Sequence, residues 1–411
     1  MLDKRVKRHV KARTHEFFAV TTPGLEDVCE AEIRCLGLDD VRPKAVPGGV
    51  VFSGKLPDLY TANLCLSTAS RILMRIDSFE ARDFPRLEKK IAEIPWELYL
   101  PADGQVSFKV SSHSSRLYHK DAVAQRIYGA ISERMAGLMV VMAEDAEIDS
   151  DESGQTSDAP VQAVFARVYE DRFTVSLDSS GELLHRRGYH SLSGRAPLRE
   201  TLAAAILRLA GYDGSMPLFD PLCGSGNFAT EAAFIAKNMP CGMNRNFAFS
   251  RWPAFSASTF DHIKKTRLEQ STTFEAPQII STDRDQKVLE SLSRRLSGLG
   301  LDDAVFVGRA DFLSLDPRRF TDEKGVVVLN PPYGKRMGTV ESARTFLAEA
   351  GERLGKLWAG FGLGIITPHE DILAKMPWTH GLSVKHVFHG GLKVAVIFGR
   401  IPERNLREVR F

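Results

Sequence analysis

The sequence lacks several features that would define other classes of protein. No apolar run approaches the ~20 residues that a membrane-spanning helix requires, and the first residues lack the apolar core of a secretory signal. Only five of the 411 residues are cysteine, and they form neither a C-x-x-C pair nor a Cys/His cluster with metal-ligand spacing. We therefore expect a cytoplasmic protein with reduced thiols, no membrane association and no bound metal.

A strong charge of one sign is also missing, because the formal net charge is only +2. Binding to nucleic acid must then come from local basic patches. Residues 1–15, with six Lys or Arg against the single Asp3, are expected to form a basic flexible arm that either contacts phosphates or is simply solvated. Residues 143–160 contain seven acidic and no basic side chains, and we expect a mobile, solvated acidic loop that would repel phosphate.

The length of the chain indicates two or three domains. Up to about residue 185, short strands and helices are separated by Pro-Gly and charged turns. From about Gly194 onward, strands and helices alternate, which is typical of a doubly wound α/β sheet. The last two strand segments, 383–388 and 392–398, are joined across Gly390-Gly391, so one strand of this hairpin must run antiparallel to the rest of the sheet.

A glycine-rich turn follows the first strand of this second half. Such a turn lets the backbone approach a ligand closely and points the start of the next helix at it. The turn has neither the G-x-G-x-x-G pattern of a dinucleotide site nor a Walker lysine, which argues against a pyrophosphate ligand. The expected ligand-binding residues of the turn are Asp220, Pro221, Cys223, Gly224, Ser225, Gly226, Asn227 and Phe228.

Polar residues also follow the next strands. Asp283 is placed to accept hydrogen bonds from ribose hydroxyls, and Asp311 to hold an adenine amine with Phe312 packing on the ring. Each aspartate alone is commonly a turn residue or a helix cap. Taken together with Asn330 at the next strand end, they favour a bound adenosyl group whose methyl faces the strand that carries Asn330.

The tetrapeptide Asn330-Pro331-Pro332-Tyr333 follows the apolar run of residues 326–329. The run predicts a buried parallel strand that ends abruptly at the prolines, at the edge of the sheet where ligands bind. A side-chain amide oxygen and a main-chain carbonyl can converge there on the two hydrogens of a planar exocyclic amine, while Tyr333 offers a ring to the base. This arrangement favours methyl transfer to nitrogen, and the four residues are the candidate catalytic set.

These residues, together with Arg187-Gly188-Tyr189 and the segment Pro197 to Ala203, resemble the THUMP-containing RNA guanine-N2 methyltransferases. The resemblance covers about residues 15–400 and is nearest to the members that modify bacterial large-subunit (23S) ribosomal RNA. It implies four parts: a basic arm (1–15), a ferredoxin-like domain (16–80), a THUMP RNA-binding domain (81–185) and a class I methyltransferase domain (186–411). Some members carry a fused second methyltransferase domain, whose activity we expect to be absent here.

The resemblance implies an α/β fold in which a ferredoxin-like plus THUMP module precedes a Rossmann-like domain with a seven-stranded, mostly parallel sheet and an antiparallel last strand. It implies S-adenosylmethionine as the methyl donor, held by the strand-end residues above, by Asn330 and by the segment around Glu200 and Thr201. That segment can equally be an N-terminal helix that packs on the sheet. Where members commonly have threonine, this chain has Asn227, which is expected to act as a helix cap.

RNA is the expected partner, ribosomal RNA rather than transfer RNA. The candidate contacts, which a solvated face explains equally well, are Arg116, His119, Lys120, Arg186, Arg187 and Tyr189. Residues 247–255 either cover the target pocket or pack over the sheet edge. A covalent role for Cys223 is rejected, because that residue lies beside the donor rather than the base.

The Asn-Pro-Pro-Tyr loop also serves methylation of adenine N6 in DNA and of glutamine in release factors. Neither of those families resembles residues 15–190 of this chain. A transfer-RNA guanosine stays an alternative substrate because THUMP enzymes act on both RNA types, and a non-catalytic RNA-binding or assembly factor stays an alternative role. The oligomeric state and the modified nucleotide are not specified by the sequence.

Overall fold

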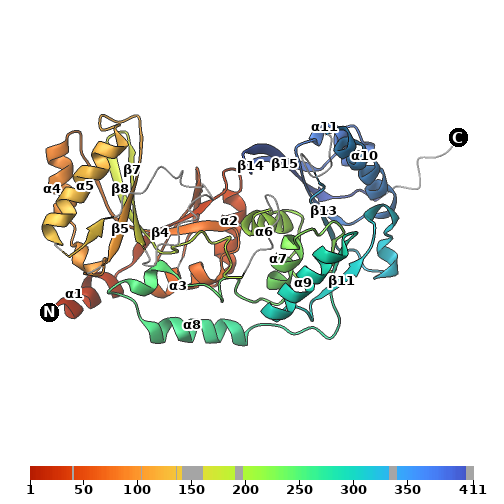
Figure 1. The fold of residues 1–411 in the computed structure, drawn as a ribbon, viewed down its shortest axis with the longest axis horizontal. Coiled ribbons are helices and arrows are strands. Elements are labelled where there is room, and N and C mark those ends of the chain that lie inside the picture. The colour runs from red at the N-terminus through yellow and green to blue at the C-terminus, as the bar shows by residue number, and fades with distance from the viewer. Residues whose placement is uncertain are drawn as a thin grey trace.

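The computed structural model describes residues 1–38, 41–102, 104–135, 137–140, 161–189, 198–332 and 340–403. Two β-sheets, one in each half of the chain, form two lobes that lie side by side (Figure 1). The expected acidic loop and Tyr333 fall outside the described residues. In the described part of the chain, no helix combines the length and apolarity that crossing a bilayer requires.

The N-terminal lobe contains one eight-stranded sheet with the strand order β2-β3-β1-β4-β8-β7-β5-β6. Strands β1 to β4 come from the segment expected to be ferredoxin-like, and β5 to β8 from the segment expected to be THUMP. The two segments share a sheet because β4 pairs antiparallel with β8. The strands are β1 (His15–Thr21), β2 (Lys44–Val46), β3 (Gly49–Gly54), β4 (Ala69–Glu80), β5 (Gln105–His113), β6 (Met139–Val140), β7 (Val161–Tyr169) and β8 (Arg172–Asp178).

Helices α2 and α3 accompany the first four strands, and α4 and α5 pack on each other beside β5. The amphipathic pattern explains the second pair: Leu87 and Ile91 of α4 are buried, as are Val123 and Ile127 of α5. The helices are α2 (Glu26–Cys35), α3 (Leu56–Cys65), α4 (Phe84–Glu93) and α5 (Lys120–Arg134), with a short 3-10 turn η2 (Trp96–Leu98) between the last two.

The N-terminal segment is ordered, contrary to the expectation of a flexible arm. It forms the helix α1 (Leu2–Val6), which continues as the π-helix η1 (Lys7–Lys11). Val6 and Val10 are buried in the core of the N-terminal lobe, and the ring of His15 hydrogen-bonds the carbonyl of Val10 at 2.8 Å. Val6 and Val10 lie four residues apart on one helix face. They were overlooked because charged residues dominate this part of the sequence. The basic side chains remain on the outer surface.

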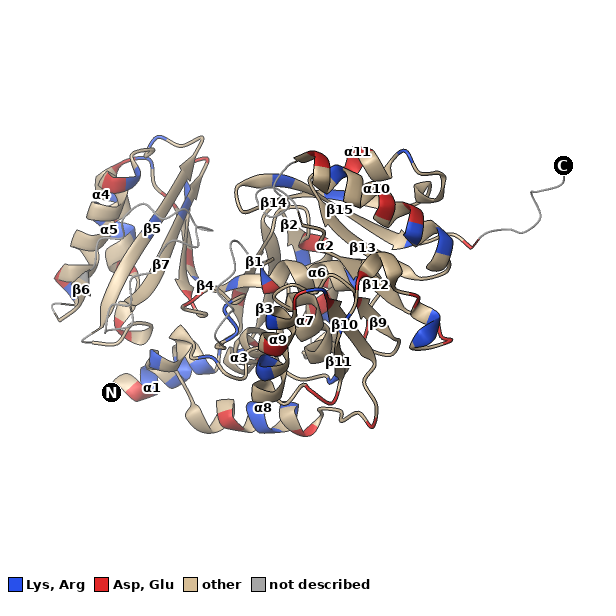
Figure 2. Cartoon of the chain, turned by 45° about the vertical axis from the view of Figure 1, so that its right-hand side comes forward, with Lys and Arg blue, Asp and Glu red and all other residues tan. Residues whose placement is uncertain are grey.

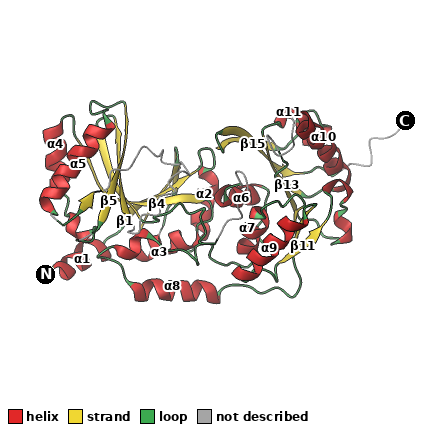
Figure 3. Ribbon diagram, in the orientation of Figure 1, coloured by secondary structure: helices red, strands yellow, loops and turns green. Residues whose placement is uncertain are grey.

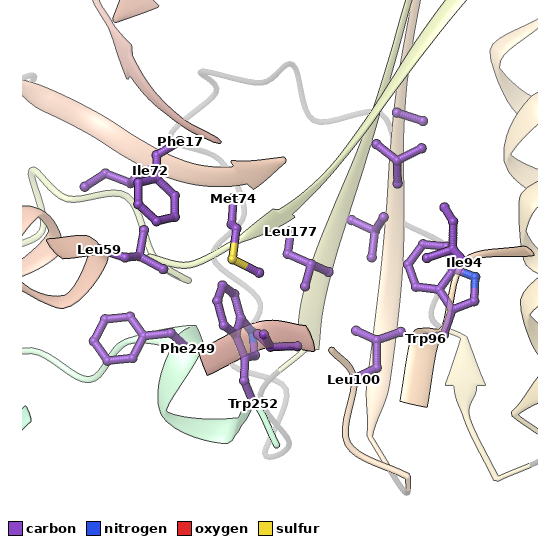
Figure 4. Packing of buried hydrophobic residues seen from close by; sticks show 14 of the residues in the cluster. Phe17, Leu59, Ile72, Met74, Ile94, Trp96, Leu100, Leu177, Phe249 and Trp252 are labelled. Atoms are coloured by element: carbon purple, nitrogen blue, oxygen red, sulfur yellow. The ribbon is translucent and has the colours of Figure 1, made fainter. Parts of the chain in front are cut away.

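Residues of the second half complete the core of the first. Phe249, within the 3-10 turn η3 (Ala248–Arg251), stacks on Tyr60 with ring centroids 4.6 Å apart, and the indole N–H of Trp252 donates to Gln162 at 2.8 Å. Both aromatic side chains lie among the apolar residues of the N-terminal lobe (Figure 4). Of the two interpretations of residues 247–255, packing is therefore correct, and the surface that they cover belongs to the N-terminal lobe. Helix α8 (Ala257–Glu269), which follows, runs along the outside of the molecule (Figure 3).

The C-terminal lobe is the expected seven-stranded sheet, with the strand order β11-β10-β9-β12-β13-β15-β14. All pairs are parallel except those of β15, which runs antiparallel to both β13 and β14. The strands are β9 (Leu218–Asp220), β10 (Ile279–Asp283), β11 (Val305–Arg309), β12 (Val326–Leu329), β13 (Gly362–Thr367), β14 (Ser383–His389) and β15 (Leu392–Arg400).

Helices cover both faces of this sheet. One apolar cluster joins one face to α6 (Glu200–Leu209), α7 (Asn227–Ala236) and α9 (Gln286–Leu299). A second cluster joins the other face to α10 (Val340–Leu357) and α11 (Glu370–Leu373). Short 3-10 turns, η4 (Phe312–Ser314), η5 (Pro317–Arg319) and η7 (Pro377–Thr379), complete the connections. The sheet is thus buried between two layers, which explains its continuous apolar strands.

Two ion pairs at the junction, one buried and one partly exposed at its arginine, fix one lobe to the other. The guanidinium of Arg187 donates to both carboxylate oxygens of Glu231 on α7, at 3.0 and 2.9 Å, and to the carbonyl of Ser67 at 2.7 Å. Arg208 of α6 donates to Glu32 of α2 at 2.8 Å. The side chain of Glu32 also accepts backbone hydrogen bonds from Ser67 and Thr68. The first pair reaches the N-terminal lobe through the carbonyl of Ser67, and the second joins α2 of that lobe to α6 of the C-terminal lobe.

Removal of Arg187 is expected to destabilise the protein strongly. An Arg187→Met substitution leaves the carboxyl of Glu231 buried without its partner, which should lower the free energy of unfolding by about 3–5 kcal/mol. Urea unfolding at pH 7 measures this change, with Lys265→Met on the exposed surface of α8 as the matched control. A loss below about 1 kcal/mol would show that the pair does not hold the lobes together.

Candidate active site

Four polar residues meet at one edge of the C-terminal sheet. Asp220 and Asp283 end β9 and β10, Asp311 lies two residues beyond β11, and Asn330 directly follows β12. These four strands are neighbours in the sheet and run parallel, so their carboxyl ends share one edge. The structure therefore brings together the residues that the sequence placed at successive strand ends. In open α/β sheets, this edge is where ligands bind.

The glycine-rich turn has the backbone that the sequence predicted. Gly224 and Gly226 have φ angles of +48° and +76°, which other residues rarely adopt. A Cβ atom at Gly226 would lie 2.3 Å from Cδ1 of Leu292, so a larger side chain would push α9 away. The N–H of Gly224 donates to Asp283 at 3.0 Å, which links the turn to the second strand. This hydrogen bond fixes the opening of the turn at the sheet edge.

Asp220 is buried, and no hydrogen bond of normal geometry compensates for the loss of water around its carboxylate within the described structure. Asp220 is 0% exposed, and among the residues that the structure describes neither of its carboxylate oxygens has a hydrogen-bond partner of normal geometry. Burial raises the pKa of this carboxyl to about 8, and the nearby charge of Asp283 raises it further. A buried acceptor of this kind carries an energetic cost unless a ligand supplies donors.

Asn330 has the same property on the neighbouring strand. Its side-chain oxygen Oδ1 is buried and has no hydrogen-bond partner within the described structure. Pro331 is buried and Pro332 half-buried, so the backbone that carries this amide is held in the protein. Tyr333 lies outside the described residues.

The acceptors at this edge fit the expected methyl donor. S-adenosylmethionine carries ammonium and hydroxyl donors, which can satisfy the unpaired Asp220 and bind the partly paired Asp283, and the glycine turn leaves space for close approach of a ligand to the backbone. Among the described residues there is no group of three or more His, Cys, Asp or Glu side chains that could hold a metal ion.

Other expected donor-binding residues face protein groups. The side-chain amide of Asn227 donates to the carbonyl of Leu198 and accepts from Arg295 at 3.4 Å. The residue that caps α7 is Gly226, so the prediction of Asn227 as a cap is wrong. Thr201 and Phe228 are buried in the layer of helices, and the hydroxyl of Ser225 lies 3.3 Å from Asn227.

Cys223 is buried within the turn, beside Pro221. Burial raises the pKa of its thiol far above the usual range, and the charge of Asp220 adds to this effect. A thiol kept neutral is a poor nucleophile, which supports the exclusion of a covalent intermediate.

The expected adenine-binding pair is only partly placed for that role. Asp311 is partly exposed; its carboxylate accepts from the N–H of Leu313 at 3.0 Å, which caps η4, and lies 3.7 Å from Arg284. Phe312 is 1% exposed and packs in the core beside Trp358, with ring centroids 6.4 Å apart. The expected packing of Phe312 on a ligand ring is therefore not what the structure shows.

The candidate RNA contacts divide into two groups. Arg116, His119 and Lys120 are exposed before and at the start of α5, and Arg186 is exposed as well. Arg187 is 2% exposed and serves the ion pair with Glu231, so the prediction that it contacts phosphate is wrong.

Tyr189, the last of these candidates, is half-buried, and its hydroxyl is buried. The guanidinium of Arg295 lies 5.3 Å from the centroid of its ring. Burial also raises the pKa of the Tyr189 hydroxyl, with contributions from the charges of Glu231 and Glu200.

Sequence reasoning missed Arg295 and underestimated Glu200. Arg295 lies within the buried stripe of α9, among Leu289, Leu292 and Leu296. An arginine in an apolar stripe was the available signal. Glu200, at the start of α6, is buried near Asn227, and burial raises the pKa of its carboxyl to about 7. Both residues support the turn from behind.

The fold and the edge of polar residues define a class I methyltransferase. The sequence comparisons agree: residues 187–396 match the family model UPF0020, described as an RMKL-like methyltransferase domain, and residues 16–73 match an RlmL ferredoxin-like domain. The chain belongs to this RMKL-like methyltransferase family, which confirms the resemblance to RNA methyltransferases of the large-subunit type.

Relatives in the family carry RNA methyltransferase names. A putative RNA methyltransferase of Synechocystis sp. is 30% identical over 85% of this chain and 88% of its own length. The ribosomal RNA large subunit methyltransferase K/L of Psychromonas ingrahamii is 29% identical over 96% of this chain and 51% of its own length. The chain thus spans about half the length of that relative.

Solved structures share the fold across nearly the whole chain. A predicted N6-adenine-specific DNA methylase from Listeria monocytogenes is 27% identical with a TM-score of 0.78, covering 95% of this chain and 97% of its own. The putative methyltransferase SMU.472, solved in complex with SAH, is 26% identical with a TM-score of 0.76, covering 95% and 99%. SAH is what remains of S-adenosylmethionine after methyl transfer, so this neighbour agrees with the expected cofactor.

Neutralising Asp220 is expected to stabilise the protein without ligand. The carboxyl ionises near pH 4 in the unfolded chain but only near pH 8 in the folded one, so its contribution to stability falls as the pH rises between these values. The difference in Tm between Asp220→Asn and the parent protein should therefore widen from pH 5 to pH 8. Thermal unfolding in a pH series measures it, and a constant difference would contradict the burial cost.

Proposed function

We propose that this protein transfers a methyl group from S-adenosylmethionine to the exocyclic N2 of a guanosine in RNA, with large-subunit ribosomal RNA as the preferred substrate. The observation that carries the proposal is the buried Oδ1 of Asn330, which has no partner among the described residues and lies one strand away from Asp220, whose carboxylate also has none there. The names of the relatives in Synechocystis sp. and Psychromonas ingrahamii support RNA as the substrate.

The target amine is a weak nucleophile because its lone pair is delocalised into the base. Hydrogen bonds from the two amine hydrogens to Asn330 Oδ1 and to the carbonyl of Pro331 would favour a more tetrahedral nitrogen and hold it in line with the methyl group. Bound S-adenosylmethionine supplies an electrophilic methyl on a positively charged sulfur. Because that charge disappears during transfer, alignment and electrostatics are the main catalytic requirements, and no strong base is needed.

Three groups at the sheet edge are suited to hold the donor. The carboxylates of Asp220 and Asp283 can accept hydrogen bonds from its ammonium and hydroxyl groups, while the backbone of the turn at Gly224 permits close approach. Asp283 already accepts a hydrogen bond from Gly224, so its carboxylate is oriented before a ligand arrives.

The N-terminal lobe is proposed to bind the RNA. The proposed division is an N-terminal basic segment (1–15), a ferredoxin-like domain (16–80), a THUMP domain (81–185) and the methyltransferase domain (186–411). Exposed Arg116, His119 and Lys120 provide candidate phosphate contacts on the THUMP segment. The basic helix α1–η1 provides another surface, because Lys7, Arg8 and Lys11 are exposed while its valines are buried. Figure 2 shows basic residues in blue along α1.

Substrate RNA can be identified directly. Methyl transfer from labelled S-adenosylmethionine is measured on ribosomal and transfer RNA from a strain that lacks the gene, followed by digestion to nucleosides. Labelled N2-methylguanosine from large-subunit RNA is the expected product. Label only in transfer RNA would move the assignment to the alternative substrate, label in N6-methyladenosine would exclude guanine, and no transfer to any RNA would favour a non-catalytic binding role.

Asn330→Ala is expected to lower kcat on the substrate RNA by about 100-fold, since it removes one of the two amine acceptors. Calorimetry should show nearly unchanged donor binding. The matched control is Asn246→Ala on the exposed surface. Unchanged turnover would contradict the role of the Asn-Pro-Pro-Tyr loop.

Charge reversal on the basic helix tests the RNA-binding surface. The triple variant Lys7→Glu, Arg8→Glu, Lys11→Glu should bind RNA more weakly, and the slope of log K against log salt should fall by about 2 because three phosphate contacts are lost. A control with the same change in net charge is Lys265→Glu, Lys356→Glu, Lys375→Glu, all at exposed sites. Equal salt slopes in the two triple variants would remove α1–η1 from the RNA-binding surface.

A further inference from the structure

The β14–β15 hairpin extends beyond the edge of the sheet at which the site lies. Following the register across the strands, Leu329 of β12 is level with Ile365 of β13, Ile397 of β15 and Val384 of β14. Phe388 lies four residues further along β14, roughly 13 Å above that level at about 3.3 Å per residue. β14 and β15 stay paired up to His389 and Leu392, whereas β13 ends at Thr367.

The hairpin tip therefore projects past the sheet edge to one side of the candidate site. β14 is the third strand from β12, which places it about 14 Å to the side of Asn330 at ~4.8 Å per strand. Because β14 runs parallel to β12, the tip lies on the same edge as the Asn-Pro-Pro loop. Nucleotides that flank a base held at Asn330 would come within reach of it.

The tip carries exposed apolar side chains next to a cation. Phe388 is 72% exposed and Leu392 51% exposed. Phe388 is the cross-strand partner of Lys393, so the ring and the ammonium-bearing side chain share one face of the hairpin. A ring beside a cation suits a nucleic-acid strand, since bases stack on the ring while the ammonium contacts phosphate.

Contacts below the tip hold the hairpin in place from both sides. On one side, Lys385 donates to the carboxylate of Asp27 at 2.9 Å and to the carbonyl of Gly24 at 2.8 Å, both in the N-terminal lobe. On the other side, His386 hydrogen-bonds Glu370 of α11 at 2.9 Å. The two-residue turn at Gly390-Gly391, with φ angles of +57° and +77°, closes the hairpin tightly. The hairpin that carries the exposed ring of Phe388 is therefore held in place by contacts on both sides.

We propose that the hairpin tip binds the RNA strand next to the target nucleotide, with Phe388 stacking on a flanking base and Lys393 contacting a phosphate. The inference rests on the proposed function and adds to it a positioning element outside the Asn-Pro-Pro-Tyr loop. RNA is favoured over a second copy of the chain because the ring lies at the catalytic edge, paired with a cation. The bracing contacts keep the ring ordered before RNA binds, which lowers the entropic cost of stacking.

The test is Phe388→Ala, assayed on the RNA that the parent protein methylates. Its kcat/KM for RNA should fall about tenfold, while donor affinity and Tm stay unchanged because the ring is exposed. Phe388→Trp should retain activity, and the fluorescence of its added indole should be quenched when RNA binds. Val384→Ala is the control, since Val384 is exposed on the same strand and face but lies at the level of Leu329.

Three outcomes overturn the inference. They are equal kcat/KM values for Phe388→Ala and the parent protein, an indole at position 388 that RNA does not quench, and a change of oligomeric state in Phe388→Ala by sedimentation, which would assign the tip to a contact between copies. Failure of the proposed function is distinguishable, because in that case the parent protein itself methylates no guanosine in RNA.

Discussion

The architecture depends on charges buried where the two lobes meet. Burial alone would raise the pKa of the Glu32 carboxyl, yet Arg208 and the hydrogen bonds from Ser67 and Thr68 outweigh burial and hold its pKa below the usual value. Since each charge is costly without its partner, the lobes can exchange this arrangement for another only by exposing or protonating these groups. The position of the N-terminal lobe relative to the sheet edge is therefore fixed.

The edge of the C-terminal sheet differs from the lobe junction in how its buried polar groups are paired. At the junction between lobes, the carboxylates of Glu32 and Glu231 have partners, whereas at the edge the carboxylate oxygens of Asp220 and Oδ1 of Asn330 have none among the described residues. Evolution tolerates such a cost where a ligand supplies the missing donors, so orphaned acceptors are an indicator of function. The raised pKa of Asp220 has the same origin, and a cationic ligand would reverse it.

Most of the fold and the composition of the sheet edge were predictable, because strands, turns and strand ends are local patterns. Asp283 and Asn330 were found as residues that follow apolar runs. Two of the errors, at Arg187 and Phe312, concern partners distant in sequence. Arg187 resembled a surface cation, but its partner Glu231 lies 44 residues away. Phe312 followed a strand as a ring-stacking residue would, yet the core around Trp358 takes it. Local sequence indicates which roles a residue can take, and tertiary packing determines which of these roles it has in the structure.

The aromatic side chains that the second half of the chain contributes to the first have a consequence for biosynthesis. Phe249 and Trp252 occupy the N-terminal core. Strand β4 can pair with β8 only after β8, about a hundred residues later in the chain, has been synthesised. The N-terminal lobe therefore cannot complete its core on the ribosome until residue 252 has emerged. Contacts of such long sequence separation are slow to form. We therefore expect the two lobes to complete their folding together rather than as independent modules.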